Sequence, residues 1–192
     1  MIIQATSHGT AAKEEPFAFT YSGDFTDNRV DGVGTIRLNT SGTLTVTGKA
    51  VTVSATIVGA GGGGAWAYLT SQYRKASGGG GGNQTVEVTL EAGTYEITIG
   101  TGGEGKRENA TITGGTGGST TAFGYTSTGG KGGKASTSPA GGEGGTPNGN
   151  KGSAVSTTTS GNLAGGSPNG GAATSVAASS NGGDGYVELI FS

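Results

Sequence analysis

The stretch VTVSATIVGAGGGG, residues 51–64, joins the two kinds of segment that decide the fold of this chain. In its first half apolar residues alternate with polar ones, and the apolar set is Val51, Val53, Ala55 and Ile57. Alternation with a period of two places these four side chains on one side of a β-strand. Its second half is a glycine run, which offers almost no side chains to a conventional core.

Similar strand patterns occur before and after this stretch. Strands are predicted at 17–22, 33–38, 42–46, 85–90, 94–99 and 185–191. The strands at 85–90 and 94–99 are separated by the turn Glu91-Ala92-Gly93, which predicts a hairpin. In this hairpin Val86, Val88 and Leu90 are expected to face Tyr95, Ile97 and Ile99. No amphipathic helix is evident, so the sequence predicts an all-β fold with an antiparallel, sandwich-like body.

Glycine accounts for 44 of the 192 residues, which is roughly three times its average usage. The glycine runs are 59–64, 78–82, 100–105, 114–118, 129–133, 141–145, 165–171 and 182–185. Many read Gly-Gly-X, and a period of three is typical of the extended left-handed helix of polyproline II type, formed here without proline. Glycine lets such backbones approach closely enough for N–H groups to donate to neighbouring carbonyls. The runs therefore predict a bundle of packed polyglycine II helices.

A low-complexity linker is the alternative interpretation of these runs. Against it, runs of similar length return at intervals, and a strand at 185–191 follows all of them. Because a terminal strand needs partners, the glycine region is expected to come back to the β body. The predicted organisation is a flexible or partner-bound lead at 1–16, a β-strand region at 17–58 and a glycine-rich region at 59–192. This last region contains the hairpin 85–99 and the closing strand 185–191.

Charge and composition exclude several classes of function. The formal net charge is -2, which predicts no general attraction to nucleic acid or to an anionic membrane. Cysteine is absent, so the chain forms neither a disulfide nor a thiolate metal site. The opening residues lack the pattern of a signal peptide. No run approaches the roughly 18 apolar residues of a membrane-spanning helix, so no membrane insertion is expected.

Residues that perform catalysis or bind metals are scarce. The single histidine, His8, lies in the lead, so one chain has too few ligands for a zinc site and no partner set for a histidine-based triad. The strings Gly-Gly-Lys131 and Gly-Gly-Lys134 are similar to a phosphate-binding loop. However, Ala135 follows Lys134 in place of the hydroxyl that would hold magnesium. We therefore expect no catalytic residue, no metal and no cofactor, and a protein that is not an enzyme.

The order of the segments is more specific than any single segment. The series is FAFTYSGDFTDNR (17–29), TIRLNTSGTLTV (35–46), VTVSATIVGAGGGG (51–64), AGTYEITIGTGG (92–103), GGTGGSTTAFGYTSTGGKGG (114–133) and NGGDGYVELIF (181–191). It resembles a glycine-rich domain found in tail proteins of bacteriophages and prophages, and the resemblance covers roughly residues 17–192. The glycine-rich half also resembles the polyglycine-helix adhesins that cap long tail fibres. In those adhesins packed helices form a rigid frame, and loops at one end contact the host receptor.

The segment 65–77 departs from the family in its number of large side chains, and it holds the only tryptophan. Because it lies between two glycine runs, we expect it to be an end loop of the bundle, with Tyr73 and Arg74 near the tip. Trp, Tyr and Arg dominate binding hot spots. The candidate receptor-binding residues are therefore Trp66, Tyr68, Tyr73 and Arg74. Alternatively, Trp66 and Tyr68 pack onto the β body, where core residues are few.

Further end loops are expected at 107–109, 136–139, 146–151 and 156–163. Most of their residues are small and polar. They either offer hydrogen bonds to a glycan or only solvate the bundle.

The resemblance implies a non-enzymatic tail or tail-fibre protein at the distal end of a fibre, which binds a glycan or protein on the bacterial cell surface. It also implies other tail or baseplate proteins as partners, and a place in the virion tail after synthesis in the bacterial cytoplasm. Whether the chain forms a homotrimer is left open. One alternative is a purely structural virion component without receptor contact. Another is an ice-binding protein, which is less favoured because threonines such as Thr157-Thr158-Thr159 are clustered and not periodic.

Overall fold

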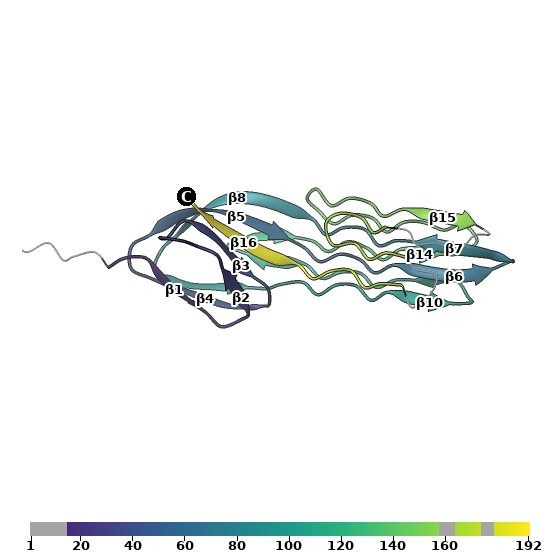
Figure 1. Cartoon of the computed structure of the whole chain (residues 1–192), viewed down its shortest axis with the longest axis horizontal. Coiled ribbons are helices and arrows are strands. Elements are labelled where there is room, and N and C mark those ends of the chain that lie inside the picture. Colours follow the sequence, from purple (N-terminus) through teal and green to yellow (C-terminus); the bar gives the residue numbers. More distant parts are fainter. Residues whose placement is uncertain (1–14, 158–163, 174–178) are drawn as a thin grey trace, which may run out of the picture.

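The computed structural model describes residues 15–157, 164–173 and 179–192. The molecule is elongated: a β body lies at one end, extended glycine segments fill the middle, and a smaller sheet forms the opposite end (Figure 1). Every regular element of the described chain is a β-strand, which confirms the all-β prediction. Within the same ranges no helix is long and apolar enough to cross a membrane. The predicted lead at 1–16 lies outside the described residues except for its last two positions.

The body consists of two antiparallel sheets. The smaller sheet has the order β1-β4-β9, with β1 at Ala18–Tyr21, β4 at Gly42–Thr47 and β9 at Gly93–Ile97. The larger sheet has the order β2-β3-β16-β5-β8, with β2 at Phe25–Asp27, β3 at Gly34–Leu38, β16 at Tyr186–Phe191, β5 at Val51–Val58 and β8 at Asn83–Leu90. A short hairpin of β12 (Thr120–Ala122) and β13 (Tyr125–Ser127) packs against β9 and β5. Each predicted strand is present, with bounds within two residues of those expected.

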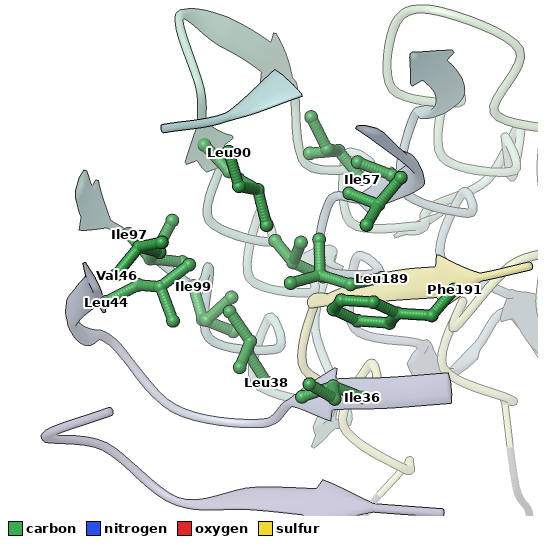
Figure 2. Close-up of a cluster of buried hydrophobic side chains, with 14 residues drawn as sticks. Ile36, Leu38, Leu44, Val46, Ile57, Leu90, Ile97, Ile99, Leu189 and Phe191 are labelled. Carbon is green, nitrogen blue, oxygen red and sulfur yellow. The ribbon is translucent and has the colours of Figure 1, made fainter. Parts of the chain in front are cut away.

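The core between the two sheets follows the alternation seen in the sequence (Figure 2). Alternate residues of β5 are buried, as are alternate residues of β3 and β16. The large buried side chains include Ile36, Leu38, Leu44, Val46, Val53, Ile57, Leu90, Ile97, Val187, Leu189 and Phe191. Burying an aliphatic or aromatic side chain of this size contributes about 1.5–3 kcal/mol. The apolar residues of a glycine-rich chain are therefore concentrated in one sandwich.

The closing strand β16 lies inside the larger sheet, between β3 and β5. In register, Leu189 pairs with Ile36 on one side and with Ala55 on the other. The expectation that the chain returns to the body after the glycine region is confirmed. Because β16 has a partner on each side, both ends of the glycine region are held by the same sheet.

The predicted hairpin of residues 85–99 is wrong. Strand β8 pairs with β5, and β9 pairs with β4 in the other sheet, so the turn after Leu90 crosses from one sheet to the other. The apolar sides were correctly predicted, since Leu90 and Ile97 are buried in the shared core. Alternation identifies which side of a strand is buried, whereas the strand partner depends on contacts with distant segments.

Residues 51–90 instead form one long hairpin that extends from the body to the far end. Val58 pairs with Asn83 at the end of the β5–β8 ladder. The glycine runs continue the same register, because the N–H groups of Gly59 and Gly62 donate to the carbonyls of Gly82 and Gly79 at 2.8 and 2.9 Å. The register then passes unchanged into a second ladder, β6 (Ala65–Leu69) with β7 (Gln72–Ala76), which begins at the pair Ala65–Ala76.

The glycine run 59–64 donates its hydrogen bonds in a cycle of three. Gly59 and Gly62 donate to 79–82, Ala60 and Gly63 donate to 115–118, and Gly61 and Gly64 donate to 180–183. Its carbonyls accept from 103–106, from 130–133 and from Gly171. The run is thus bonded to six other segments of the chain.

Burial in the glycine region follows the position of each run. Every residue of 59–64 and 78–82 is buried. In five of the surrounding runs only every third residue is buried, at 100 and 103, 114 and 117, 130 and 133, 142 and 145, and 182 and 185. In the run 165–171 the buried residues are 166 and 171. This explains why the two inner runs are almost pure glycine while the outer runs carry larger residues such as Glu104 and Lys131.

Replacing a glycine that lies against the backbone of a neighbouring run should loosen this region. A Cβ on Gly117 would lie 2.5 Å from the carbonyl oxygen of Ala60, and one on Gly132 would overlap the carbonyl oxygen of Gly114. Since backbone cannot rotate away as a side chain does, we expect Gly117→Val and Gly132→Val each to lower the free energy of unfolding by roughly 1–3 kcal/mol. Thermal unfolding measures the effect.

The matched control is Gly183→Ala. Gly183 is an exposed glycine of an outer run, and its Cβ would meet nothing nearer than the Asn169 Cβ at 3.3 Å. Its melting temperature should stay close to that of the parent chain. Unchanged melting temperatures in both valine variants would contradict the role given to close backbone contact.

Candidate binding surface at the far end of the molecule

The segment 65–77 is a β-hairpin, not the loop expected from the sequence. Its two strands are joined by a two-residue turn, Thr70-Ser71, with φ angles of 49° and 60°. Positive φ at both positions is the geometry that suits a tight hairpin between twisted strands. The Arg74 guanidinium donates to the Thr70 hydroxyl at 3.0 Å, and that hydroxyl donates to the Leu69 carbonyl. The tip of the hairpin is therefore Thr70-Ser71, and Tyr73 and Arg74 lie in a strand.

Two more strands complete the far-end sheet, which has the order β10-β6-β7-β15. Strand β10 (Lys106–Glu108) pairs with β6 in parallel, and β15 (Ala154–Thr157) pairs with β7 antiparallel. Figure 1 shows this sheet at the end of the molecule opposite the body. Its central hairpin, β6 and β7, directly continues the two fully buried glycine runs, 59–64 and 78–82.

The strand register gathers aromatic and cationic side chains on one side of this sheet. One row across the four strands is Arg107, Trp66, Lys75 and Val155, and the next row contains Tyr68, Tyr73 and Thr157. We call these seven residues the aromatic face. The Tyr73 ring centroid lies 5.6 Å from that of Trp66 and 5.1 Å from that of Tyr68. The Arg107 guanidinium lies 4.3 Å from the Trp66 ring centroid.

Arg74 does not belong to this face. It pairs in register with Ala67 and Ser156, on the opposite side of the sheet, and its guanidinium donates to the Ser156 hydroxyl at 2.5 Å. On that side Ala65 and Ala67 pack against Ala135 of β14 (Lys134–Ala135) and Ile112 of β11 (Ile112–Thr113). The structure thus brings together three of the four predicted residues and separates Arg74 from them.

The aromatic side chains differ in exposure. Trp66 is only 4% exposed, whereas Tyr68 is 43% exposed and Tyr73 is half-buried. The alternative prediction that Trp66 and Tyr68 pack onto the β body is wrong, because both residues lie in the far-end sheet. Of the two, only Trp66 is buried. Among the described residues no acceptor bonds the buried Trp66 Nε1.

Sequence reasoning missed two cations of this face, Arg107 and Lys75. Arg107 was expected to belong to a polar end loop, but it lies in β10 and stacks on Trp66. Lys75 is buried 5.8 Å from the Tyr73 ring centroid, and this burial lowers the pKa of its amine below the ordinary value. The spacing Trp66-x-Tyr68 and Tyr73-x-Lys75 has the period of two that signals a strand. That signal was present in the sequence.

The other expected end loops lie at different ends of the glycine region. The turn at 146–148 lies beside the body, since the Asn148 amide donates to the Asn83 carbonyl and the Asn83 amide donates to the Asn148 carbonyl. A second turn of similar sequence, Ser167-Pro168-Asn169, lies on the same side, where the Asn169 amide donates to the Asp184 carbonyl. The segment 136–139 directly follows β14. Of 156–163, two residues lie in β15 and the rest fall outside the described ranges.

The described chain offers little metal or phosphate chemistry. Across residues 15–157, 164–173 and 179–192, no group of three or more His, Cys, Asp or Glu side chains is arranged to hold a metal ion. Lys131 lies in a glycine segment and Lys134 in β14, and neither precedes a helix as a phosphate-binding loop requires. His8 lies outside the described residues.

The chain matches a known protein family over most of its length. A family model described as a glycine-rich domain matches residues 37–190, which includes most of the body, all described glycine segments and the far-end sheet. No curated protein matches the chain.

Trp66 is the only tryptophan, so its fluorescence reports on the far-end sheet alone. Because the ring is buried and covered by the Arg107 guanidinium, we expect the native emission to be blue-shifted and poorly quenched by acrylamide. Arg107→Ala should increase quenching. Arg37→Ala removes a similar contact between a guanidinium and the Tyr186 ring in the body, and it should leave the quenching of Trp66 unchanged. A native chain quenched as readily as the unfolded chain would show that Trp66 is not buried.

Proposed function

We propose that this chain, which belongs to the glycine-rich domain family, is a non-enzymatic tail or tail-fibre protein of a bacteriophage that binds a receptor on the bacterial surface. One observation carries the proposal. The aromatic face, with the exposed Tyr68 and Arg107, lies on a sheet at the end of an elongated molecule, opposite the body. A binding surface at the end of a long rigid frame is the arrangement that a distal adhesin needs.

The frame itself is proposed to be a bundle of polyglycine II helices. Three observations support this. The N–H groups of run 59–64 donate to three neighbouring segments in a repeating order of three, and the run is bonded to six segments in all. In addition, five of the outer runs bury every third residue. A helix with three residues per turn has this symmetry. Fixing each glycine costs about 1–2 kcal/mol in backbone entropy, so only a cooperative lattice of hydrogen bonds between segments offsets it.

The chemistry of the aromatic face suits adhesion. Tyrosine rings bury a large area while losing little conformational entropy, and arginine adds directional hydrogen bonds. Tyr68 and Tyr73 pair across β6 and β7, whose ladder continues the buried glycine runs. The two rings are therefore held in position in the absence of ligand. Preorganisation of this kind increases affinity because less freedom is lost on binding.

A purely structural tail component is the second candidate. It is favoured by the exposed apolar side chains of the body, Phe25, Val30 and Val33, of which Val30 and Val33 pair across the turn between β2 and β3. Such a patch fits contact with other tail or baseplate proteins or with sister chains of a homotrimer. Both candidates place the chain in the virion tail after synthesis in the bacterial cytoplasm.

The receptor proposal is tested with the double variant Tyr68→Ala, Tyr73→Ala. Adsorption of the labelled chain to intact bacteria, including cells of the organism that encodes it, should fall by about tenfold or more, because hot-spot truncations cost about 2 kcal/mol or more. Tyr125→Ala is the matched control, since Tyr125 is 41% exposed but lies in β13 beside the body. Equal adsorption by the folded double variant and the parent would favour the purely structural candidate.

The lead is proposed to join this chain to another tail protein or to a sister subunit. Described residues begin at Glu15, whose carbonyl accepts from the N–H of Lys49, between strands β4 and β5 of the body. Deleting residues 1–14 should therefore abolish incorporation into virions while leaving the adsorption of the isolated chain intact. Virions assembled with the truncated chain, and containing it in normal amount, would refute this role.

A further inference from the structure

We infer that the aromatic face, if it binds the bacterial surface as proposed above, recognises an anionic polysaccharide. In this assignment sugar rings lie on Tyr68 and Tyr73, and a carboxylate or phosphate substituent pairs with Arg107. The inference rests on the proposed function and adds to it the chemical class of the receptor.

Arg107 is the residue that points to an anion. Its guanidinium is held 4.3 Å from the Trp66 ring centroid, and the residue is exposed. No carboxylate or other acceptor in the described part of the chain accepts from this guanidinium. A guanidinium stacked on a ring keeps its planar fork of N–H donors for a partner at its edge, and carboxylates and phosphates match that fork with two parallel hydrogen bonds.

Glu104 and Glu108 line one surface pocket with Arg107, but neither forms an ion pair with its guanidinium. Glu108 pairs in register with Ala67 and so lies on the opposite side of the sheet. Glu104 forms an ion pair with Lys106, with 3.9 Å between the ammonium nitrogen and the carboxylate oxygen. The aromatic face contains no carboxylate, and Arg107 is its exposed cation. The face therefore attracts anions, and this attraction weakens as salt is added.

The size and composition of the face favour a polysaccharide over a protein. Its accessible residues are Tyr68, the half-buried Tyr73, Val155 and Arg107. A stable protein interface requires about 20–30 residues on each side. A few rings with one arginine suffice for one or two sugar units, and a repeating polymer adds affinity when several copies of the protein engage it.

The experiment is binding of the full chain to an array of neutral, carboxylated and phosphorylated glycans, at low and at physiological salt. We expect the bound glycans to be anionic. Comparison of the carboxylated glycans with the phosphorylated ones shows which substituent is recognised. Arg107→Ala should weaken binding about tenfold or more, since it removes a charge-assisted pair. Arg107→Lys should recover only part of the loss, because lysine keeps the charge but lacks the fork.

Arg37→Ala is the matched control, because Arg37 also stacks on a ring, that of Tyr186, but lies in the body. Unchanged melting temperatures show that the variants are folded. Two results would overturn the anionic polysaccharide and still support the receptor proposal. One is binding to neutral glycans that depends on Tyr68. The other is adsorption to cells that depends on Tyr68 and is removed by protease treatment of the cells, while no glycan on the array is bound. If the chain adsorbs to cells equally well without the Tyr68 side chain, both the anionic polysaccharide and the receptor proposal are overturned.

Discussion

The close approach of glycine backbones is the constraint on which the rest of the molecule depends. Gly62 donates to Gly79 at 2.9 Å, and a Cβ on Gly62 would overlap the carbonyl of Lys131 on another side. Each inner glycine is surrounded by backbone, so the hydrogen bonds between segments require that side chains be absent. Backbone polar groups that no helix or conventional sheet satisfies are paired in this way. The abundance of glycine is thus a packing requirement and not a sign of disorder.

The β sandwich supplies what the glycine region lacks, which is apolar burial. Strand β16 lies between β3 and β5, and β8 pairs with β5, so the chain enters and leaves the glycine region through one sheet. The hydrophobic effect stabilises this body in the ordinary manner. The body and the glycine region form one frame, since the ladder of β5 and β8 continues in unbroken register through Gly59 and Gly82.

The candidate site depends on the same frame. The long hairpin 51–90 carries Trp66, Tyr68 and Tyr73 at its far end, and β10 adds Arg107 from a separate run. The Trp66 ring contacts the Arg107 guanidinium, and the Tyr73 ring contacts the rings of both Trp66 and Tyr68. The tryptophan thus serves as the base of the face, and Tyr68 and Arg107 are its accessible groups.

The sequence by itself determined seven strands of the β body, which of their sides are buried and where the backbone must be free of side chains. Those properties are local, because alternation and the absence of a Cβ are set residue by residue. Only the tertiary structure decided the partners: β8 pairs with β5 and not with β9, residues 65–77 form a hairpin, and Arg74 is turned away from the aromatic face. It also placed Arg107 on Trp66. Pairing and register are set by contacts between residues far apart in the chain, and no local pattern in the sequence records which distant segment will be the neighbour.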